Sequence, residues 1–333
     1  MKVHVTGVAG LIGSHLARRW LELGAEVSAC DDFSNGYEDN VEKAVRLYVA
    51  NCCDLEAMIR ATRGADVVYH CAASPHEGLS VFSPHAVTQS VFCTTVSVAT
   101  ACVVNKVRRL VCMSSMARYG NIRVPYTEDQ HPEPEDPYGI AKWASELEVS
   151  LLAKVHGLEY TIAVPHNVVG VGQVYSDPYR NVVAIMINRC LQGKPPIVYG
   201  DGEQERCFSH VSDALDCLVK MADSPAALGE TINIGPDENF VSINKLAEIV
   251  MRHTDFKGEP THVPPRPQEV KHAYCSSDKA RRLLDYRTTK TLEQTVEEMV
   301  AWIRKRGPLP FNYHLPLEIV NEKTPKTWTE KLI

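Results

Sequence analysis

The sequence predicts an α/β fold, a doubly wound parallel sheet with a smaller α/β domain beside it, on three observations. Short runs of β-branched and other apolar residues alternate with helical stretches through the first half of the chain. The strand-like runs are apolar nearly throughout, which is typical of parallel strands covered by helices on both faces. From about residue 168 the alternation loosens, and proline and glycine become frequent.

The individual elements follow from the apolar pattern and its interruptions. Short runs rich in valine and isoleucine indicate strands at 2–7, 26–31, 65–72, 107–115 and 158–167. Longer stretches whose apolar residues recur every three or four positions indicate helices at 11–24, 54–62, 83–104, 136–157, 242–253 and 290–305. Gly24 ends the first helix. The tail from Gly307 is rich in proline and aromatic residues, and we assign no element to it.

Composition excludes several classes of protein. With 333 residues, 44% hydrophobic and 23% charged, the chain resembles an ordinary globular protein. A net charge of −6 without a basic run argues against nucleic acid as a partner. The eleven cysteines lack metal-type spacing, because the one tight pair, Cys52 and Cys53, is adjacent. We therefore expect reduced thiols in a cytoplasmic protein without a metal site. We see no signal peptide and no apolar run long enough to span a membrane.

The first strand and helix are joined by the glycine-rich segment "TGVAGLIG". Gly7 permits a tight turn, Gly10 lets the backbone approach a pyrophosphate, and Gly13 allows close helix–strand packing. The helix that opens at Leu11 and Ile12 offers unpaired N–H groups to an anion. The place of this glycine-rich segment between the first strand and the first helix predicts a dinucleotide-binding site.

Acidic residues at the next strand ends refine this prediction. Asp31 lies about 20 residues beyond the loop, where a carboxylate can accept both ribose hydroxyls and would repel a 2′-phosphate, so NAD is the expected cofactor. Asp32 and Asn35 are further cofactor candidates, although capping of the following turn explains them equally well. Asp54 and Leu55 lie where an adenine amine is expected, and a helix N-cap explains Asp54 nearly as well.

A tyrosine and a lysine in "YGIAK" are spaced to share one helix face. Tyr138 and Lys142 stand four residues apart, and the preceding predicted strand ends in Ser115. A phenol has a pKa near ~10 and is a weak base at neutral pH, and a nearby ammonium together with the positive nicotinamide ring would favour its phenolate form and lower that pKa. This pairing suits removal of a hydroxyl proton as the carbon loses hydride. A second match to the spacing, Tyr286 to Lys290, follows no serine-bearing strand and is expected to be incidental.

Taken in order, the glycine pattern, Asp31, "HCAAS", "SSMARYG" and "YGIAK" resemble the extended short-chain dehydrogenase/reductase family. Within it the chain is similar to NAD-dependent nucleotide-sugar epimerases and dehydratases, above all UDP-hexose 4-epimerases. The resemblance covers about residues 1–305 and implies a Rossmann-like sheet. It implies that Ser115 binds the sugar oxygen that Tyr138 deprotonates, that Lys142 also holds the nicotinamide ribose, and that Ala72 and Ala73 line the cofactor.

The resemblance also implies a division of the chain and an assembly. We expect an NAD-binding domain at 1–168 plus about 208–236, and a nucleotide-sugar-binding domain at 169–207 plus 237–306. A C-terminal tail, 307–333, remains. Helices near 84–105 and 138–155 are expected to form a homodimer interface.

By the same resemblance, a nucleotide diphosphate is bound by residues of the second half. The expected contacts are Asn167, Asn181, Val182, Arg206 and Arg266, with Glu269 for a ribose hydroxyl and Tyr199 for the base or the core. Arginine donors fit phosphate oxygens, although either arginine taken alone could be a solvated surface residue.

The sugar substituents have fewer candidates. Ala273 falls where a small side chain would admit an N-acetyl group. His76, in the segment 74–80, could read the sugar substituents or be a solvated loop residue. Arg118 and Arg123 could pair with a C6 carboxylate, although exposed arginines are the commoner case.

The reaction is predicted from the two residues after Ser115. Dehydratases of the family carry Asp-Glu there, and decarboxylating relatives keep a glutamate, whereas this chain has Met116 and Ala117. Loss of a general acid–base group costs roughly 10²–10⁴ in rate. We therefore expect a nucleotide-sugar 4-epimerase that works through a transient 4-keto sugar with Tyr138 as base. The alternatives are a 4-ketoreductase or dehydratase of the same family and, remotely, a non-catalytic dinucleotide sensor.

Overall fold

The computed structural model of the chain describes residues 1–266 and 273–333. Its centre is a seven-stranded, wholly parallel sheet with the strand order β11-β6-β5-β4-β1-β2-β3. The strands are β1 (Lys2–Thr6), β2 (Glu26–Asp31), β3 (Arg46–Val49), β4 (Val67–His70), β5 (Arg109–Met113), β6 (Glu159–Pro165) and β11 (Thr231–Ile234). The predicted fold class is confirmed. β3 and β11 were not delimited from the sequence.

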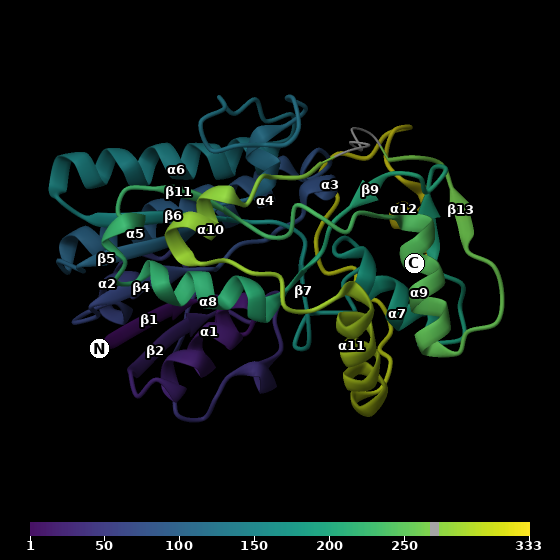
Figure 1. Cartoon of the computed structure of the whole chain (residues 1–333), viewed down its shortest axis with the longest axis horizontal. Coiled ribbons are helices and arrows are strands. Elements are labelled where there is room, and N and C mark those ends of the chain that lie inside the picture. Colours follow the sequence, from purple (N-terminus) through teal and green to yellow (C-terminus); the bar gives the residue numbers. More distant parts are fainter. Residues whose placement is uncertain (267–272) are drawn as a thin grey trace.

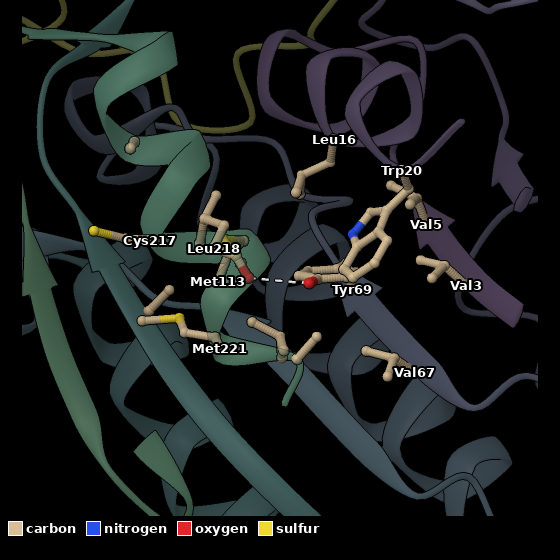
Figure 2. Close-up of a cluster of buried hydrophobic side chains, with 14 of the residues drawn as sticks. Val3, Val5, Leu16, Trp20, Val67, Tyr69, Met113, Cys217, Leu218 and Met221 are labelled. Atoms are coloured by element: carbon tan, nitrogen blue, oxygen red, sulfur yellow. Dashed lines mark hydrogen bonds between the residues drawn. The ribbon is translucent and has the colours of Figure 1, made fainter. Parts of the chain in front are cut away.

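Helices cover both faces of this sheet (Figure 1). On one face lie α1 (Leu11–Glu22) and α8 (Val211–Met221), and on the other lie α2 (Leu55–Ala61), α5 (Thr94–Val104) and α6 (Pro137–His156). Successive residues of β4 alternate between these faces, since Val67 and Tyr69 join the first core cluster and Val68 joins the second. Figure 2 shows the first cluster, where the Tyr69 hydroxyl donates to the carbonyl of Leu218, 3.0 Å away.

The second half builds a smaller unit at the right of Figure 1, around α7 (Val182–Leu191), α9 (Ile243–Thr254) and α11 (Leu292–Arg306). Three two-stranded sheets complete it: β7 (Val168–Val169) with β10 (Ser209–His210), β8 (Ile197–Tyr199) with β13 (Thr261–Val263), and β9 (Glu205–Arg206) with β12 (Val241–Ser242). α10 (Asp278–Leu284) packs back on α8 and β11. The predicted domain boundaries stay a prediction.

Short elements connect these layers. They are η1 (Glu38–Asn40), α3 (Glu77–Ser80), α4 (Pro84–Thr88), η2 (Gln89–Cys93), η3 (Met116–Tyr119), η4 (Pro225–Ala227) and α12 (Lys326–Thr329).

α4, η2 and α5 form one continuous helix from Pro84 to Val104, with a mean hydropathy of 1.6 in its most apolar window. By length and composition alone this helix could span a membrane. The expectation that no apolar segment is long enough to do so is therefore wrong.

The tail beyond α11, which the sequence left unassigned, packs against the rest of the molecule. Trp328 is 3% exposed and meets Phe82 and Tyr179 edge to face, at centroid distances of 5.9 and 5.5 Å. The Glu318 carboxylate accepts hydrogen bonds from the backbone N–H groups of His85 and Ala86, both at 2.9 Å. The tail therefore links α4 to the smaller unit.

Candidate active site

A cavity of about 910 Å³ runs along the carboxyl ends of the sheet strands and on into the smaller unit. Its lining includes the glycine loop that follows β1 and, from the smaller unit, Tyr199 and Arg266. Ligands of open α/β sheets bind at this edge. The cavity is therefore the candidate site, and it brings together residues predicted separately for cofactor and substrate.

The glycine loop has the shape that a pyrophosphate requires. Gly7 has φ +73°, and its N–H donates to the Cys30 carbonyl at 2.8 Å. A Cβ on Gly13 would lie 2.1 Å from the Gly7 carbonyl oxygen, so α1 packs closer than any side chain allows. Gly10 precedes α1 without a side-chain cap, and Leu11 and Ile12 face the cavity behind it. The first-turn N–H groups of α1 are thus left to bind an anion.

Asp31 ends β2 on the cavity wall with its carboxylate held in place. One oxygen accepts the N–H of Ala9 and the other that of Phe33, each at 2.8 Å. Burial raises the pKa of Asp31, while these two hydrogen bonds act to lower it. A carboxylate oriented in this way retains lone pairs for two ribose hydroxyls, so the chain's residues fit NAD.

The other cofactor candidates divide into two groups. Asp32 and Asn35 line the cavity, but Asp32 also caps its own turn, because it accepts the N–H of Ser34 at 3.0 Å. Asp54 accepts the N–H of Ala57 at 2.9 Å as the N-cap of α2, and neither it nor Leu55 lies on the cavity wall. For Asp54 the structure favours the helix-cap alternative.

Adjacent wall residues complete the cofactor end. Asn51, Cys52 and Cys53 line the cavity where Asp54 and Leu55 were expected. Ala72 and Ala73 line it as predicted, and a Cβ on Gly7 would come within 2.7 Å of the Ala72 nitrogen.

The structure brings Ser115, Tyr138 and Lys142 together on the cavity wall. α6 starts at Pro137 because the carboxylate of Asp136 caps the N–H of Gly139 at 2.9 Å. The Lys142 ammonium donates to the Met113 carbonyl at 2.7 Å and lies 5.9 Å from the centroid of the Tyr138 ring. Ser115 follows β5 and accepts the N–H of Ala117 at 3.2 Å.

The protein groups around Tyr138 do not by themselves lower the pKa of its phenol. Burial raises the pKa of its phenol above the usual value, and the Ser115 hydroxyl acts to lower it. Burial also lowers the pKa of Lys142. Because desolvation outweighs the nearby positive charge, the protein groups alone hold Tyr138 as a neutral phenol. The predicted lowering of its pKa, which also involves the positive nicotinamide ring, stays a prediction.

A buried ion pair supports this centre from behind. Glu146 lies one turn beyond Lys142 on α6, accepts a short hydrogen bond from the Ser114 hydroxyl, and pairs with Arg118 at 2.8 Å. The guanidinium of Arg118 lies between the rings of Tyr119 and Trp143, 4.7 and 4.8 Å from their centroids. Arg118 is therefore used inside the protein, which contradicts its suggested role with a C6 carboxylate. Arg123 is exposed.

The diphosphate candidates also reach the cavity. Asn167, Asn181, Val182, Tyr199, Arg206 and Arg266 line it, as does Ala273. The guanidinium of Arg266 lies 4.6 Å from the centroid of the Tyr199 ring, and Asn181 caps α7 by accepting the N–H of Val183. Glu269 lies outside the described residues.

His76 is placed differently from the prediction. It is fully buried behind the wall, and its Nε2 hydrogen-bonds to Asp177 at 2.7 Å. Its neighbour Glu77 lines the cavity instead. His76 thus holds the wall segment in position and does not face the sugar space.

Besides Asn51, Cys52 and Cys53, sequence reasoning missed two further groups of wall residues. The tail contributes Leu315 and Ile333, and Thr327 hydrogen-bonds to the Tyr199 hydroxyl at 2.7 Å. Arg180, directly before the N-cap of α7, is the other. A charged residue before a helix start was a signal available for Arg180, whereas no local pattern indicated the docking of the tail.

Comparisons with known proteins agree with this geometry. Residues 3–235 match the NAD dependent epimerase/dehydratase family. A putative UDP-glucose 4-epimerase from Methanocaldococcus jannaschii is 28% identical over 308 residues, covering 91% of this chain and 98% of the relative. A UDP-N-acetyl-alpha-D-glucosaminuronate decarboxylase from Bacillus cytotoxicus is 28% identical over 316 residues, covering 90% and 97%. The crystal structure of the UDP-glucose 4-epimerase from Thermotoga maritima with UDP-glucose superposes with a TM-score of 0.86 at 29% identity, covering 92% and 99%.

Proposed function

Because this chain belongs to the NAD-dependent epimerase/dehydratase family, we propose that it is a nucleotide-sugar 4-epimerase that uses NAD and acts on UDP-sugars. The carrying observation is the site after β5, where Ser115 is followed by a thioether and a methyl group, Met116 and Ala117. Neither side chain can move a proton, so this position lacks the group that elimination or decarboxylation requires. The similar proteins include several that are named as UDP-glucose 4-epimerases.

Each residue of the centre has a role in moving one proton. Tyr138 and Ser115 both line the cavity. In this proposal the Tyr138 phenol exchanges a proton with the sugar O4, and Ser115 hydrogen-bonds the same oxygen in its hydroxyl and keto forms. NAD, when bound, supplies a positive ring and the chemistry of accepting a hydride from C4 and returning it. Lys142, fixed by the Met113 carbonyl, is positioned to bind the nicotinamide ribose and to favour the phenolate.

Between the two half-reactions the 4-keto sugar must rotate, so that the hydride returns to its opposite face. Tyr138 then returns its proton to the O4 of the inverted sugar, so the protein ends in the protonation state in which it began. Arg206 and Arg266 are expected to hold the diphosphate meanwhile, and the small side chain of Ala273 to leave room for the ring. No net redox change follows from this cycle.

One observation favours a second candidate, a dehydratase. Glu77 lines the cavity and raises the pKa of Tyr138 by its negative charge, so a carboxylate does lie near the reacting hydroxyl, although on α3 and not beside Ser115.

Incubation of the purified protein with UDP-, GDP- and dTDP-sugars, read by mass spectrometry and NMR, separates the epimerase from the dehydratase. Epimerisation predicts products of unchanged mass, whereas loss of water would establish elimination. Stoichiometric consumption of dinucleotide would indicate a 4-ketoreductase.

We further propose a homodimer formed through α6. Four apolar side chains on this helix are more than half exposed and recur at helical spacing: Ile140, Leu147, Leu151 and Val155. An exposed apolar stripe of this kind supports helix pairing. Sedimentation of the wild type and of Leu151→Glu tests it, with a dimer expected for the first and a monomer for the second. A wild-type protein that sediments only as a monomer would contradict the proposal.

A cytoplasmic location is also proposed. It is supported by the eleven cysteines, which are all free thiols. Free thiols persist in reducing compartments. Fractionation of cells that express the full chain tests this, and recovery with the membrane fraction would oppose it.

A further inference from the structure

Three side chains behind the cavity wall form a cluster of metal-ligand type. His76 directly precedes α3, Asp177 lies in the loop before α7, and His314 belongs to the tail. One ring nitrogen of each histidine and one carboxylate oxygen of Asp177 lie within 4.8 Å of one another. His76 and Asp177 are buried, and His314 is half-buried. The expectation of no metal site was based on cysteine spacing, which cannot reveal a set whose members are far apart in the chain.

Each histidine of this cluster has one nitrogen with a hydrogen bond and one without. Nε2 of His76 bonds to Asp177 at 2.7 Å, and Nδ1 of His314 bonds to the carbonyl of Asn312 at 3.0 Å. Carboxylate and carbonyl oxygens are acceptors, so in neutral imidazoles these two nitrogens carry the ring protons. The other two nitrogens then present lone pairs, and both are buried without a hydrogen-bond partner in the described part of the chain. Since a buried polar atom without a partner is costly, a bound group is expected here.

The hydrogen bonds behind the rings are those of a metal site. A histidine that ligates a metal almost always donates its other N–H to a carboxylate or carbonyl, which fixes the orientation of the ring. His76 and His314 both have such a partner. Their ring centroids are 6.2 Å apart, and the ring of Tyr179 packs against both, at 6.4 and 6.5 Å. The two imidazoles are therefore held near each other by contacts that leave one nitrogen of each ring available.

Asp177 can supply an oxygen to the same ion. Its carboxylate accepts the N–H of Tyr179 at 2.8 Å in addition to the His76 bond, and a carboxylate has about four acceptor positions. Ligands about 2.1 Å from a tetrahedral zinc ion lie about 3.4 Å from one another, so the cluster must contract by roughly 1 Å. His314 lies in a stretch of the tail without helix or strand, which can supply this movement.

The charges around the cluster limit its affinity for a cation. Asp177 is also the electrostatic partner of Arg180, and the positive charge of Arg180 opposes a cation nearby. Two neutral imidazoles and one carboxylate remain a ligand set that Zn²⁺ accepts, with water in the open position. The expected dissociation constant is therefore micromolar, weaker than that of a closed site made of thiolates.

We propose that His76, Asp177 and His314 bind Zn²⁺, and that the ion fastens the tail to the cavity wall. Leu315, directly after His314, lines the cavity, and Pro178 lines it directly after Asp177. An ion shared by the two segments would hold both parts of the wall in place. The site lies behind the wall, so it takes no part in the proton transfer at Tyr138, and the inference does not depend on the proposed reaction.

The test is metal binding by the full chain after treatment with a chelator. Calorimetry with Zn²⁺ should give one ion per chain at micromolar Kd for wild type, and binding at least about 10-fold weaker for His314→Phe, which keeps a ring beside Tyr179. His262→Phe is the matched control, because the His262 ring also bonds to a carbonyl, that of Gly200 at 2.9 Å, but is exposed. Zn²⁺ should slow trypsin cleavage at Lys323 and Lys326 in wild type and in His262→Phe, but not in His314→Phe.

Binding to cysteines is the main competing outcome, and Co²⁺ separates it. Co²⁺ in the proposed site should show no thiolate charge-transfer absorption, whereas such absorption, or equal Zn²⁺ affinity in wild type and His314→Phe, would place the ion elsewhere. Failure of wild type to bind Zn²⁺ would overturn the site. Zn²⁺ binding that leaves tail cleavage unchanged would overturn the fastening of the tail. Matching melting curves show that the variants fold, and the wild-type Co²⁺ spectrum decides the ligand type even if His314→Phe does not.

Discussion

Tyr138 is the residue on which the chemistry depends, and its surroundings keep it protonated until ligands arrive. Replacing Tyr138 with Phe should reduce epimerisation by roughly 10²–10⁴-fold, the range typical for loss of a general acid–base group, and leave NAD binding unchanged. The measurement is turnover together with a titration of cofactor binding. Tyr286→Phe is the matched control, since that tyrosine is also buried and has the same spacing to a lysine. Full turnover by Tyr138→Phe would contradict the proposed mechanism.

At the same scale, Glu146 makes the core behind Ser115 sensitive to pH. Burial raises the pKa of Glu146 to about 7, against an ordinary value of 4.5. The folded protein thus binds this proton more tightly than the unfolded chain, so the stability it contributes is present below about pH 4.5 and is lost as the pH rises to about 7.

The Glu146→Gln variant cannot lose that proton. Its free energy of unfolding, relative to wild type, should therefore increase between pH 5 and pH 8 by up to on the order of 3 kcal/mol. Urea unfolding at several pH values measures this, and Glu148→Gln on the same helix is the control. Parallel pH profiles for Glu146→Gln and wild type would show that Glu146 titrates normally.

At the scale of elements, α6 carries the catalytic pair because its first turn is fixed. Asp136 caps α6 and Asp54 caps α2 with hydrogen bonds of the same length, 2.9 Å, which makes the two helices a matched comparison. Asp136→Ala and Asp54→Ala should each cost about 1 kcal/mol of stability. Turnover should fall only for Asp136→Ala, because Tyr138 lies two residues beyond that cap. Equal turnover in both variants would show that the cap stabilises α6 without placing the phenol.

At the scale of the whole molecule, the tail contributes Leu315 and Ile333 to the cavity wall. Trp328→Ala removes its main anchor, and such truncations of buried aromatic residues typically cost 3–5 kcal/mol. The tail should then detach, with faster trypsin cleavage at Lys323 and Lys326 and a higher KM for the UDP-sugar. Val320→Ala is the control, since that tail residue is 63% exposed. A cleaved tail with an unchanged KM would show that the tail is not part of the substrate site.

The features predictable from sequence are those set by local pattern. The glycine loop, Asp31 at the end of β2 and the Tyr138–Lys142 pair were found because strand-to-helix turns and helix spacing fix their places. His76 was misjudged because its burial depends on Asp177, a hundred residues away. The tail wall and the pairing of Arg118 with Glu146 likewise depend on tertiary contacts that no local pattern reports.

The central claim is that the site moves a hydride off C4 of the sugar and back, and that no carboxylic side chain directly after Ser115 takes part. Incubation with a UDP-sugar in D₂O tests it directly, because a returned hydride carries no solvent proton, whereas removal of a C5 proton admits deuterium. NMR and mass spectrometry should find the C4 epimer with unchanged mass and no deuterium on carbon. Deuterium at C5, or a product lacking water, would contradict the account.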